Sequence, residues 1–308
     1  MYALSKNKWV IIAAAVIGII FVIFFYYYHN NNNNLMNLYR PASSGIDKFG
    51  IREIYPTKPG GEEWFMNMQD PTSDPRFNPQ AALTKNPDGS YKVTKQQIRM
   101  EVYTSAGYHQ DKITTLNQKE LAAKGYMQSP NDWKNVEMTG YVKLISSPLD
   151  DQFNWYNRGG RHIDSRPCEG TAYKSDVMYY CSGKTRFNKE QWFGKGYAFT
   201  PPKTVSSSSI QGKWVGLKYI VYNFQQQNGN QTAVRLQSWF DVNNDGKNWV
   251  KINDFVDSGG WGNQGRYCGG APDQIITWGG STATFRWDYA TDVDFKNFSV
   301  REIQAPPQ

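Results

Sequence analysis

The chain begins with a long uninterrupted apolar run and continues with short segments in which apolar and polar residues alternate. The run WVIIAAAVIGIIFVIFFYYY at 9–28 contains no charged residue. About 20 helical residues cross the hydrocarbon core of a bilayer, so we predict a transmembrane helix over 9–28. A cleavable signal peptide would have a shorter apolar region that ends in small residues, whereas this run ends in aromatic ones.

Positive charge lies on only one side of this run. Lys6 and Lys8 precede it, and His29 with a run of asparagines follows it. Lysine-rich flanks stay in the cytoplasm, so we expect residues 1–8 inside and the rest of the chain outside the cell or in a lumen. Residues 29–47 have no apolar period and are predicted to be an Asn-rich tether. The first predicted partner is therefore a lipid bilayer, contacted through 9–28, in a cell or in a virion membrane.

From 48 to 304 the apolar positions recur with period two, which is typical of half-buried strands. Gly, Asn, Asp and Pro separate these segments, and helical periodicity is scarce. We predict one all-β ectodomain over 48–304, built as a two-sheet antiparallel sandwich with one short helix and followed by a tail at 305–308. The predicted strands cover 97–104, 136–145, 176–183, 214–224, 233–242, 248–256, 283–288 and 295–303.

Local signals mark one helix and the two ends of this domain. The segment TLNQKELAAKG has Thr115 as N-cap, Gln118 as its capping partner and Gly125 as a C-terminal stop. The strings FGIREI at 49–54 and FSVREI at 298–303 are nearly identical. We expect them to be the first and last strands, lying near each other.

The turn NNDG at 243–246 joins two strongly alternating segments and predicts a hairpin. Asp241, Asn243 and Asp245 also match the opening of a calcium loop, D-x-N-x-D-G. Position twelve of such a loop needs a bidentate carboxylate, and Ile252 stands there. The plain hairpin is favoured, and the calcium site is kept as a weaker alternative.

Charge and cysteine content limit the partners, cofactors and disulfides that we expect for this protein. The net charge is +7, but no run of five basic residues occurs, so nucleic acid is not an expected partner. Three cysteines without zinc-type spacing do not predict a metal centre, and no cofactor is expected. Outside the cytoplasm they allow one disulfide. The glycine-flanked strings RPCEG and RYCGG favour Cys168 with Cys268 over pairings with Cys181, although sequence leaves the pairing open.

Four segments together resemble a known superfamily: VEMTGYVKL, KWVGLKYIVYNF, LQSWFDVNNDGKNWVKI and DVDFKNFSVREI. They are similar to the concanavalin A-like lectin/glucanase jelly roll, above all to its polysaccharide-lyase-like members and to anchored proteins of archaea and large viruses. The likeness covers most of 48–303. It implies a concave sheet that grips a glycan. Lectins, hydrolases, lyases and non-catalytic modules share this superfold, so it does not by itself indicate an activity.

Within that resemblance, the segment 233–242 supplies candidate binding residues. Alternation places Arg235, Gln237 and Trp239 on one side, where an indole plate and directional donors suit a sugar. Arg158 and Arg166 are further candidates for a glycan with acidic groups. The alternative is that Trp239 packs beneath a covering segment while Arg235 is solvated.

Catalytic motifs are weaker. A glucanase of this fold carries two carboxylates in E-x-D-x-x-E or E-x-D-x-E, which is absent, so glycoside hydrolysis is disfavoured. A uronate lyase needs a base, an acid and a group that neutralises the substrate carboxylate. His162, Tyr197 and Arg161 are the candidates, but the Q-x-H motif is missing. We therefore predict an anchored carbohydrate-binding jelly roll; the alternatives are a polysaccharide lyase and a structural envelope or virion protein.

Overall fold

The computed structural model describes residues 45–146, 152–178, 183–194, 196–226 and 231–306. The predicted anchor at 9–28, most of the tether, and Cys181 lie outside these ranges. Within them, no helix has the length and apolarity needed to cross a membrane. Residues 44–308 form one compact unit, which contains everything described below.

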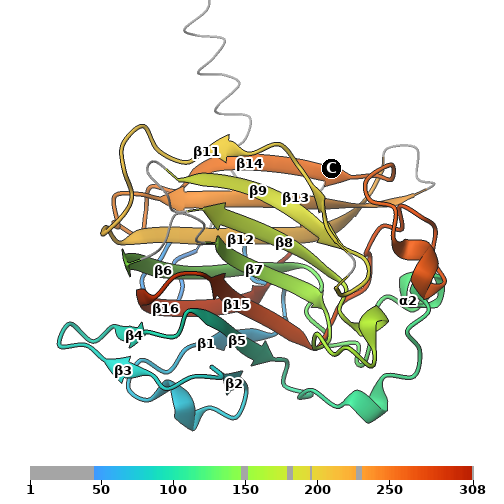
Figure 1. Cartoon of the computed structure of the whole chain (residues 1–308), viewed down its shortest axis with the longest axis horizontal. Helices are drawn as coiled ribbons and strands as arrows, with labels where there is room; N and C mark the ends of the chain where they lie inside the picture. Colours follow the sequence, from blue (N-terminus) through green and yellow to red (C-terminus); the bar gives the residue numbers. More distant parts are fainter. Residues whose placement is uncertain (1–44, 147–151, 179–182, 195, 227–230, 307–308) are drawn as a thin grey trace, which may run out of the picture. The chain divides into compact units, whose positions relative to one another are not determined.

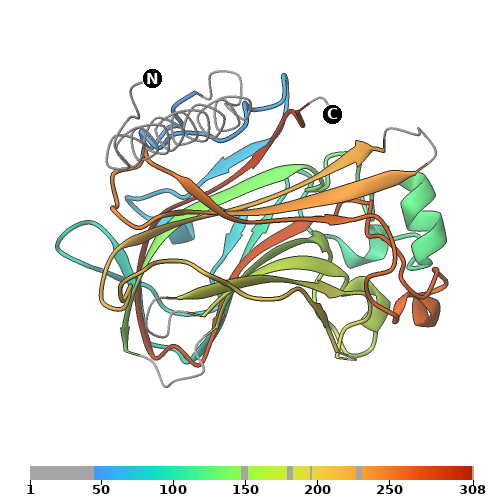
Figure 2. The same ribbon diagram turned by 90° about the horizontal axis from the view of Figure 1, so that it is seen from above.

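Two antiparallel sheets pack face to face and form the predicted sandwich; Figure 1 labels their strands and Figure 2 shows them as two layers. In sheet A the order is β14 (Val250–Asp257), β13 (Thr232–Asp241), β12 (Val215–Gln225), β6 (Val136–Ser146), β16 (Asp292–Glu302), β4 (Tyr91–Val93) and β3 (Thr84–Lys85), with β1 (Glu63–Phe65) on β16. In sheet B it is β10 (Ala198–Phe199), β9 (Lys184–Glu190), β8 (Ala172–Met178), β7 (Gln152–Gly159), β15 (Thr282–Asp288), β5 (Gln97–Tyr103) and β2 (Phe77–Asn78), with β11 (Lys203–Thr204) on β9.

The main core lies between the two sheets, because one side of each alternating strand is apolar. Trp155 of sheet B contacts Phe285 of the same sheet and Phe298 of sheet A, with ring centroids 4.8 and 5.7 Å apart. All three rings are fully or almost fully buried. Each buried ring contributes roughly 1.5–3 kcal/mol through its removal from water. The apolar side chains of each strand therefore face the core, and the alternate side chains lie on the outer face of the sheet.

All eight predicted strands exist, but neither β7 and β9 of sheet B nor the strands of two or three residues were predicted from the sequence. Strand β7 was missed because its alternation is short and is followed by Asn157 and Arg158, two polar residues that are fully buried. Strand β9, KTRFNKE, was missed because its inward set includes Lys189. The predicted strand 176–183 in fact starts at Ala172 and is described only to Met178.

Helix α2 spans Gln118–Lys124, and its start differs from the prediction. Asn117, not Thr115, is the N-cap, because the Asn117 side chain accepts from the Glu120 N–H at 3.1 Å. Gly125 ends the helix in the left-handed region, as predicted. Short 3₁₀ turns complete the described elements: η1 (Pro71–Ser73), η2 (Gln110–Lys112), η3 (Pro167–Glu169) and η4 (Gly265–Cys268).

Residues 45–57, here called the strap, cover part of the outer face of sheet A; Figure 2 shows the strap in blue on that side. The predicted strand at 49–54 does not form. Instead, Ile51 and Ile54 pack on Tyr222 and Ile303 in a second apolar cluster. The two ends of the domain therefore meet as predicted, but as an irregular segment against a strand.

Candidate functional site

The outer face of sheet B is polar, because its strands place their apolar side chains in the core and their polar ones outside. On β5, for example, Ile98, Met100 and Val102 belong to the core, so Arg99 and Glu101 point the other way. We call this surface the polar face. Its members are Gln97, Arg99, Glu101, Asn154, Tyr156, Lys174, Asp176, Arg186, Asn188, Glu190, Thr284, Arg286 and Asp288.

Two pockets follow each other along strands β5, β15 and β7 of the polar face. The first, of about 270 Å³, is called the His162 pocket; its lining is Gln80, Arg99, Glu101, Tyr156, Gly160, Arg161, His162, Ile163 and Thr284. The second, of about 240 Å³, is called the Tyr289 pocket; its lining is Gln97, Asn154, Asp176, Asn188, Tyr197, Phe199, Arg286, Asp288 and Tyr289. Both pockets are open to the surface and together form an extended polar site.

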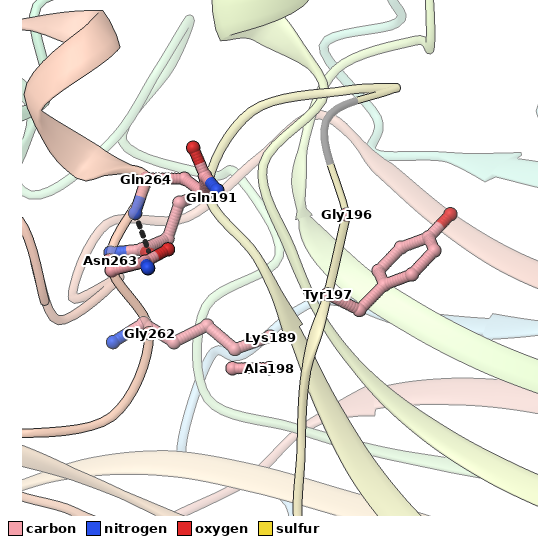
Figure 3. Close-up of a pocket in the computed structure, with 8 residues that line it drawn as sticks. All are labelled: Lys189, Gln191, Gly196, Tyr197, Ala198, Gly262, Asn263 and Gln264. Atoms are coloured by element: carbon pink, nitrogen blue, oxygen red, sulfur yellow. Dashed lines mark hydrogen bonds between the residues drawn. The ribbon is translucent and has the colours of Figure 1, made fainter.

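A third pocket, of about 380 Å³, lies between the segment after β9 and the loop before η4 (Figure 3). Its polar groups are already engaged. Lys189 Nζ contacts the Trp261 and Asp273 carbonyls and the Asp257 carboxylate, and Gln191 accepts from the Gln264 N–H at 3.0 Å. Figure 3 shows the Tyr197 ring pointing away from the other lining residues. The lysine and the glutamine of this pocket are thus held by other protein groups.

His162 lies at the edge of the polar face, with only 3% of its side chain exposed. Its ring stacks on Tyr156 with centroids 5.3 Å apart and packs on Phe193 at 4.6 Å. Burial, together with Lys174 and neighbouring arginines, holds the pKa of His162 well below its usual value. The imidazole is neutral at neutral pH.

The nearby carboxylate of Glu190 does not restore the pKa of His162 to its usual value. Glu190 Oε2 lies 3.3 Å from His162 Nε2, which by itself would favour the imidazolium. Lys174 Nζ lies closer to the same oxygen, at 2.7 Å, and both partners are almost fully buried. The lysine neutralises the carboxylate, so burial decides the charge of His162.

Aromatic rings border the Tyr289 pocket. Tyr197, Phe199 and Tyr289 are 42%, 46% and 52% exposed. Cations pack on two of them: Arg186 Cζ lies 3.9 Å from the Phe199 centroid, and Lys174 Nζ 4.6 Å from the Tyr197 centroid. Burial raises the pKa of Tyr197 to about 12, so its phenol stays protonated at neutral pH.

The backbone is unusual where it contributes to these pockets. Tyr289 has φ 66° and Gln80 has φ 54°. Few non-glycine residues adopt this left-handed region, and such conformations gather at functional sites. The positive φ at Tyr289 occurs in the short turn between β15 and β16, at the rim of the Tyr289 pocket.

The structure brings the predicted catalytic candidates to one face. Arg161 and His162 line the His162 pocket, and Tyr197 lines the neighbouring one. Arg161 is engaged by Glu101, with Nη2 and Oε2 2.9 Å apart. Lys174 lies between the two pockets, over the rings of Tyr156 and Tyr197.

The candidates from 233–242 lie on the opposite side of the sandwich, on the outer face of sheet A. Trp239 packs in the cluster beside the strap. Gln237 accepts from Trp239 Nε1 and from the hydroxyl of Tyr55, both at 3.1 Å. Arg235 Nε lies 2.7 Å from the Asp254 carboxylate. A ligand on the polar face does not reach these three residues, and their predicted binding role remains a prediction for the other face.

The two remaining arginine candidates do not line either pocket of the polar face. Arg158 is fully buried, and its guanidinium donates to the carbonyls of Lys134 and Ile276. Burial lowers the pKa of Arg158 to about 10. Arg166 Nη1 donates to the Gln110 carbonyl at 3.1 Å. Both arginines hold loops around sheet B in place.

The carboxylates of the calcium alternative serve the hairpin itself. Asp241 Oδ2 accepts from the Tyr141 hydroxyl at 2.7 Å and from the Gly246 N–H at 2.8 Å. Asp245 Oδ1 accepts from the N–H groups of Lys247 and Asn248. In the described parts of the chain, no cluster of three or more His, Cys, Asp or Glu side chains is arranged to hold a metal ion.

A disulfide joins Cys168 of η3 to Cys268 of η4, the pairing that the sequence favoured. It ties the segment that follows β7, where Arg161 and His162 lie, to the loop that precedes β15. The bond therefore restrains one end of the polar face. A disulfide of this kind persists in an oxidising compartment.

Acid is expected to weaken the fold through His162. Below pH 6.5 the unfolded chain protonates this histidine whereas the folded chain does not, so stability is complete above pH 6.5 and is lost as the pH falls. Between pH 7.5 and 5.5 the free energy of unfolding should drop by about 1.4 kcal/mol more in the wild type than in His162→Phe. Urea titrations of both proteins at the two pH values measure the difference. Equal losses would mean that His162 ionises alike in both states.

Sequence reasoning missed the residues that define the polar face, although the signal was present. In the predicted strands 97–104 and 283–288 the polar positions Arg99, Glu101, Arg286 and Asp288 alternate strictly with apolar ones. The sequence does not show that these two strands are neighbours. Phe199 and Tyr289 had no such signal, because one lies on a two-residue strand and the other in a turn.

The fold and site define an antiparallel β-sandwich with an extended polar site on one outer face. No protein-family model matches the chain, and no curated protein matches it. Solved structures that are similar to it include the carbohydrate-binding module CBM66 from Bacillus subtilis, with 8% identity over 78% of this chain and 96% of that one and a TM-score of 0.37.

Two further solved structures have comparable scores. A protein of unknown function with a galectin-like fold from Bacillus subtilis has 10% identity over 81% of this chain and 100% of that one, with a TM-score of 0.41. The CBM2 module of the evolved Dit protein of Lactobacillus casei BL23 phage J-1 has 5% identity over 80% and 99%, with a TM-score of 0.40. These likenesses are too distant to indicate what the chain does.

Proposed function

We propose that this protein binds carbohydrate on the polar face of sheet B. The observation that carries the proposal is the combination of exposed rings and hydrogen-bonding side chains in one open site. Phe199 and Tyr289 border a pocket whose floor contains Asn154, Asn188 and Gln97. An aromatic ring offers an apolar plate to the C–H face of a sugar, and amide groups offer both donors and acceptors to its hydroxyls.

Charge on the polar face favours a glycan with acidic groups. The cations Arg99, Lys174, Arg186 and Arg286, with Arg161 beside them, outnumber the anions Glu101, Asp176, Glu190 and Asp288. The imidazole of His162 is neutral and does not change this balance of charge. The proposal does not extend to β-elimination, because His162 packs against the rings of Tyr156 and Phe193 and exposes only 3% of its side chain to the pocket that it lines.

The proposal includes the location. The apolar run at 9–28 supports a single-pass anchor, and the charged flank supports a cytoplasmic N-terminus. The Cys168–Cys268 disulfide supports a sandwich domain outside the cytoplasm. The polar face would then present its site to glycans outside the membrane.

The test is a glycan array probed with the full chain in mild detergent, followed by titration of the best ligand. The double variant Phe199→Ala/Tyr289→Ala is expected to bind it about tenfold more weakly, because each lost ring contact contributes roughly 0.5–1.5 kcal/mol. Trp239→Phe, on the outer face of sheet A, is the matched control and should bind normally. A blank array, or a loss with Trp239→Phe and none with the double variant, would refute binding on the polar face.

A further inference from the structure

Two arginines of the polar face stand directly opposite each other. In the register of sheet B, Arg286 of β15 is the partner of Arg99 of β5, and Asn154 of β7 is the next member of the same row. Directly opposed side chains have Cβ atoms about 5 Å apart. Like charges in such a pair are destabilising. The sandwich therefore maintains an unfavourable arrangement at the centre of its open polar site.

The neighbouring carboxylates pair with only one of these two arginines. Asp288 Oδ2 lies 2.8 Å from Arg286 Nη2 and forms an ion pair with that guanidinium. Glu101, two residues along from Arg99, is engaged by Arg161. Arg99 forms no ion pair with any residue in the parts of the chain that the structure describes.

Donor atoms of both arginines are also left unused. Arg99 Nε and Arg286 Nε are buried and have no hydrogen-bond partner among the described residues. A buried donor without a partner costs about 1–3 kcal/mol, more for a charged group. His162 lines the same pocket as Arg99; its Nδ1 has no hydrogen-bond partner among the described residues, whereas its Nε2 faces Glu190 Oε2 at 3.3 Å.

The pair lies where the two pockets meet. Arg99 lines the His162 pocket and Arg286 lines the Tyr289 pocket, and both lie in one cross-strand row. A ligand that follows the strands from one pocket to the next would pass over both guanidinium groups. The unfavourable charge and the unused donors would be relieved together by an oxyanion at this point.

We propose that Arg99 and Arg286 form a subsite for the acidic group of a glycan, a carboxylate or a sulfate. This inference rests on the proposed function and adds the two residues that recognise the acidic group of the glycan. Guanidinium groups match the paired oxygens of such anions in a bidentate manner, which an ammonium group does not. Arg161, Arg186 and Arg286 each pair with a carboxylate, so Arg99 is the arginine of the polar face without an ion pair among the described residues, and Arg286 lies directly opposite it.

The experiment measures dissociation constants of the full chain for three forms of oligosaccharide. Oligogalacturonates and alginate oligosaccharides supply carboxylates, the same oligosaccharides after reduction of their carboxyl groups supply neutral counterparts, and carrageenan oligosaccharides supply sulfates. We expect one acidic form to bind about 10- to 100-fold more tightly than the neutral forms, since a hydrogen bond to a charged group contributes roughly 1.5–3 kcal/mol. The preferred acidic form identifies the anion.

Variants separate the subsite from general attraction to a basic protein. Arg99→Gln and Arg99→Lys should both lose most of the acidic preference while retaining binding of the neutral form, the lysine because it keeps the charge without the planar fork. Arg52→Gln removes the same charge from the exposed side of the strap, on the outer side of sheet A, and should keep the preference. Equal binding of acidic and neutral forms, or an unchanged preference in Arg99→Gln, overturns this inference and leaves carbohydrate binding intact. Absence of binding to every glycan overturns both.

Discussion

Glu137→Gln is expected to lower the free energy of unfolding by about 3–5 kcal/mol, because it leaves buried Lys218 without a paired carboxylate and leaves Arg301 with only the less buried Glu53. Glu137 lies on the outer side of sheet A, and its Oε1 is 2.6 Å from Lys218 Nζ and 3.0 Å from Arg301 Nη2. All three side chains are almost completely buried. Glu137 Oε2 also accepts from the N–H groups of Ile54 and Tyr55.

The charges of this cluster are coupled. Burial raises the pKa of Glu137, but Lys218 and Arg301 outweigh it and hold that pKa below its usual value. Burial lowers the pKa of Lys218 even though Glu137 pulls it up. We expect the ionised form at neutral pH, because one carboxylate is shared by two cations. The neutral amide of glutamine would remove that stabilisation and loosen the strap.

Urea unfolding of Glu137→Gln and of the wild type measures this effect. Glu302→Gln is the matched control, since its partner Lys58 is largely exposed and such a pair contributes only about 0–1 kcal/mol. Limited proteolysis should cut the Glu137→Gln variant within 45–57 before the wild type is cut there. A loss no larger than that of Glu302→Gln would show that the buried cluster is not a source of stability.

Removal of the disulfide is the second large effect. The double variant Cys168→Ser/Cys268→Ser should unfold with a free energy lower by about 4 kcal/mol, because the bond closes a long loop, with a sequence separation of 100, and restricts the unfolded chain. The segment that places Arg161 and His162 at the polar face should also lose its attachment to η4. Urea unfolding measures the first effect, and glycan titration measures the second.

A reducing agent provides the control. It should lower the unfolding midpoint of the wild type and leave that of the double variant unchanged, since the variant has no such bond to reduce. If the wild type and the variant unfold at the same urea concentration, the bond does not contribute to stability. If the variant is less stable but binds glycan equally well, the bond stabilises the domain without shaping the site.

Much of the fold could be predicted because alternation is a local property. In the predicted strand at 136–145, Val136, Met138 and Val142 occupy one side, and that side is the core in the structure. The strands β7 and β9 were not predictable in this way, because β7 buries the polar residues Asn157 and Arg158 and β9 points Lys189 inward. Both cases depend on what packs against the strand, which its own residues do not specify.

The same limit applies to the prediction of the site residues. Arg161, His162 and Tyr197 were predicted from residue type, and the structure brings them to the polar face. Trp239 was predicted with equal reason, yet sheet A carries it on the opposite side. Residue type and alternation show that a side chain leaves the core. They do not show on which of the two outer faces it emerges.

The sequence by itself determined the strand class, the short helix that ends at Gly125, the hairpin around 243–246 and the apolar side of the predicted strands. All of these depend on contacts within a few residues or on the partition of side chains between core and surface. Only the tertiary structure decided which strands are neighbours and in what register. That register sets Arg99 opposite Arg286, although 187 positions separate them in the chain (286 minus 99). Pairing between distant strands is fixed by the whole packed sandwich, so the arginine pair has no counterpart in any local pattern.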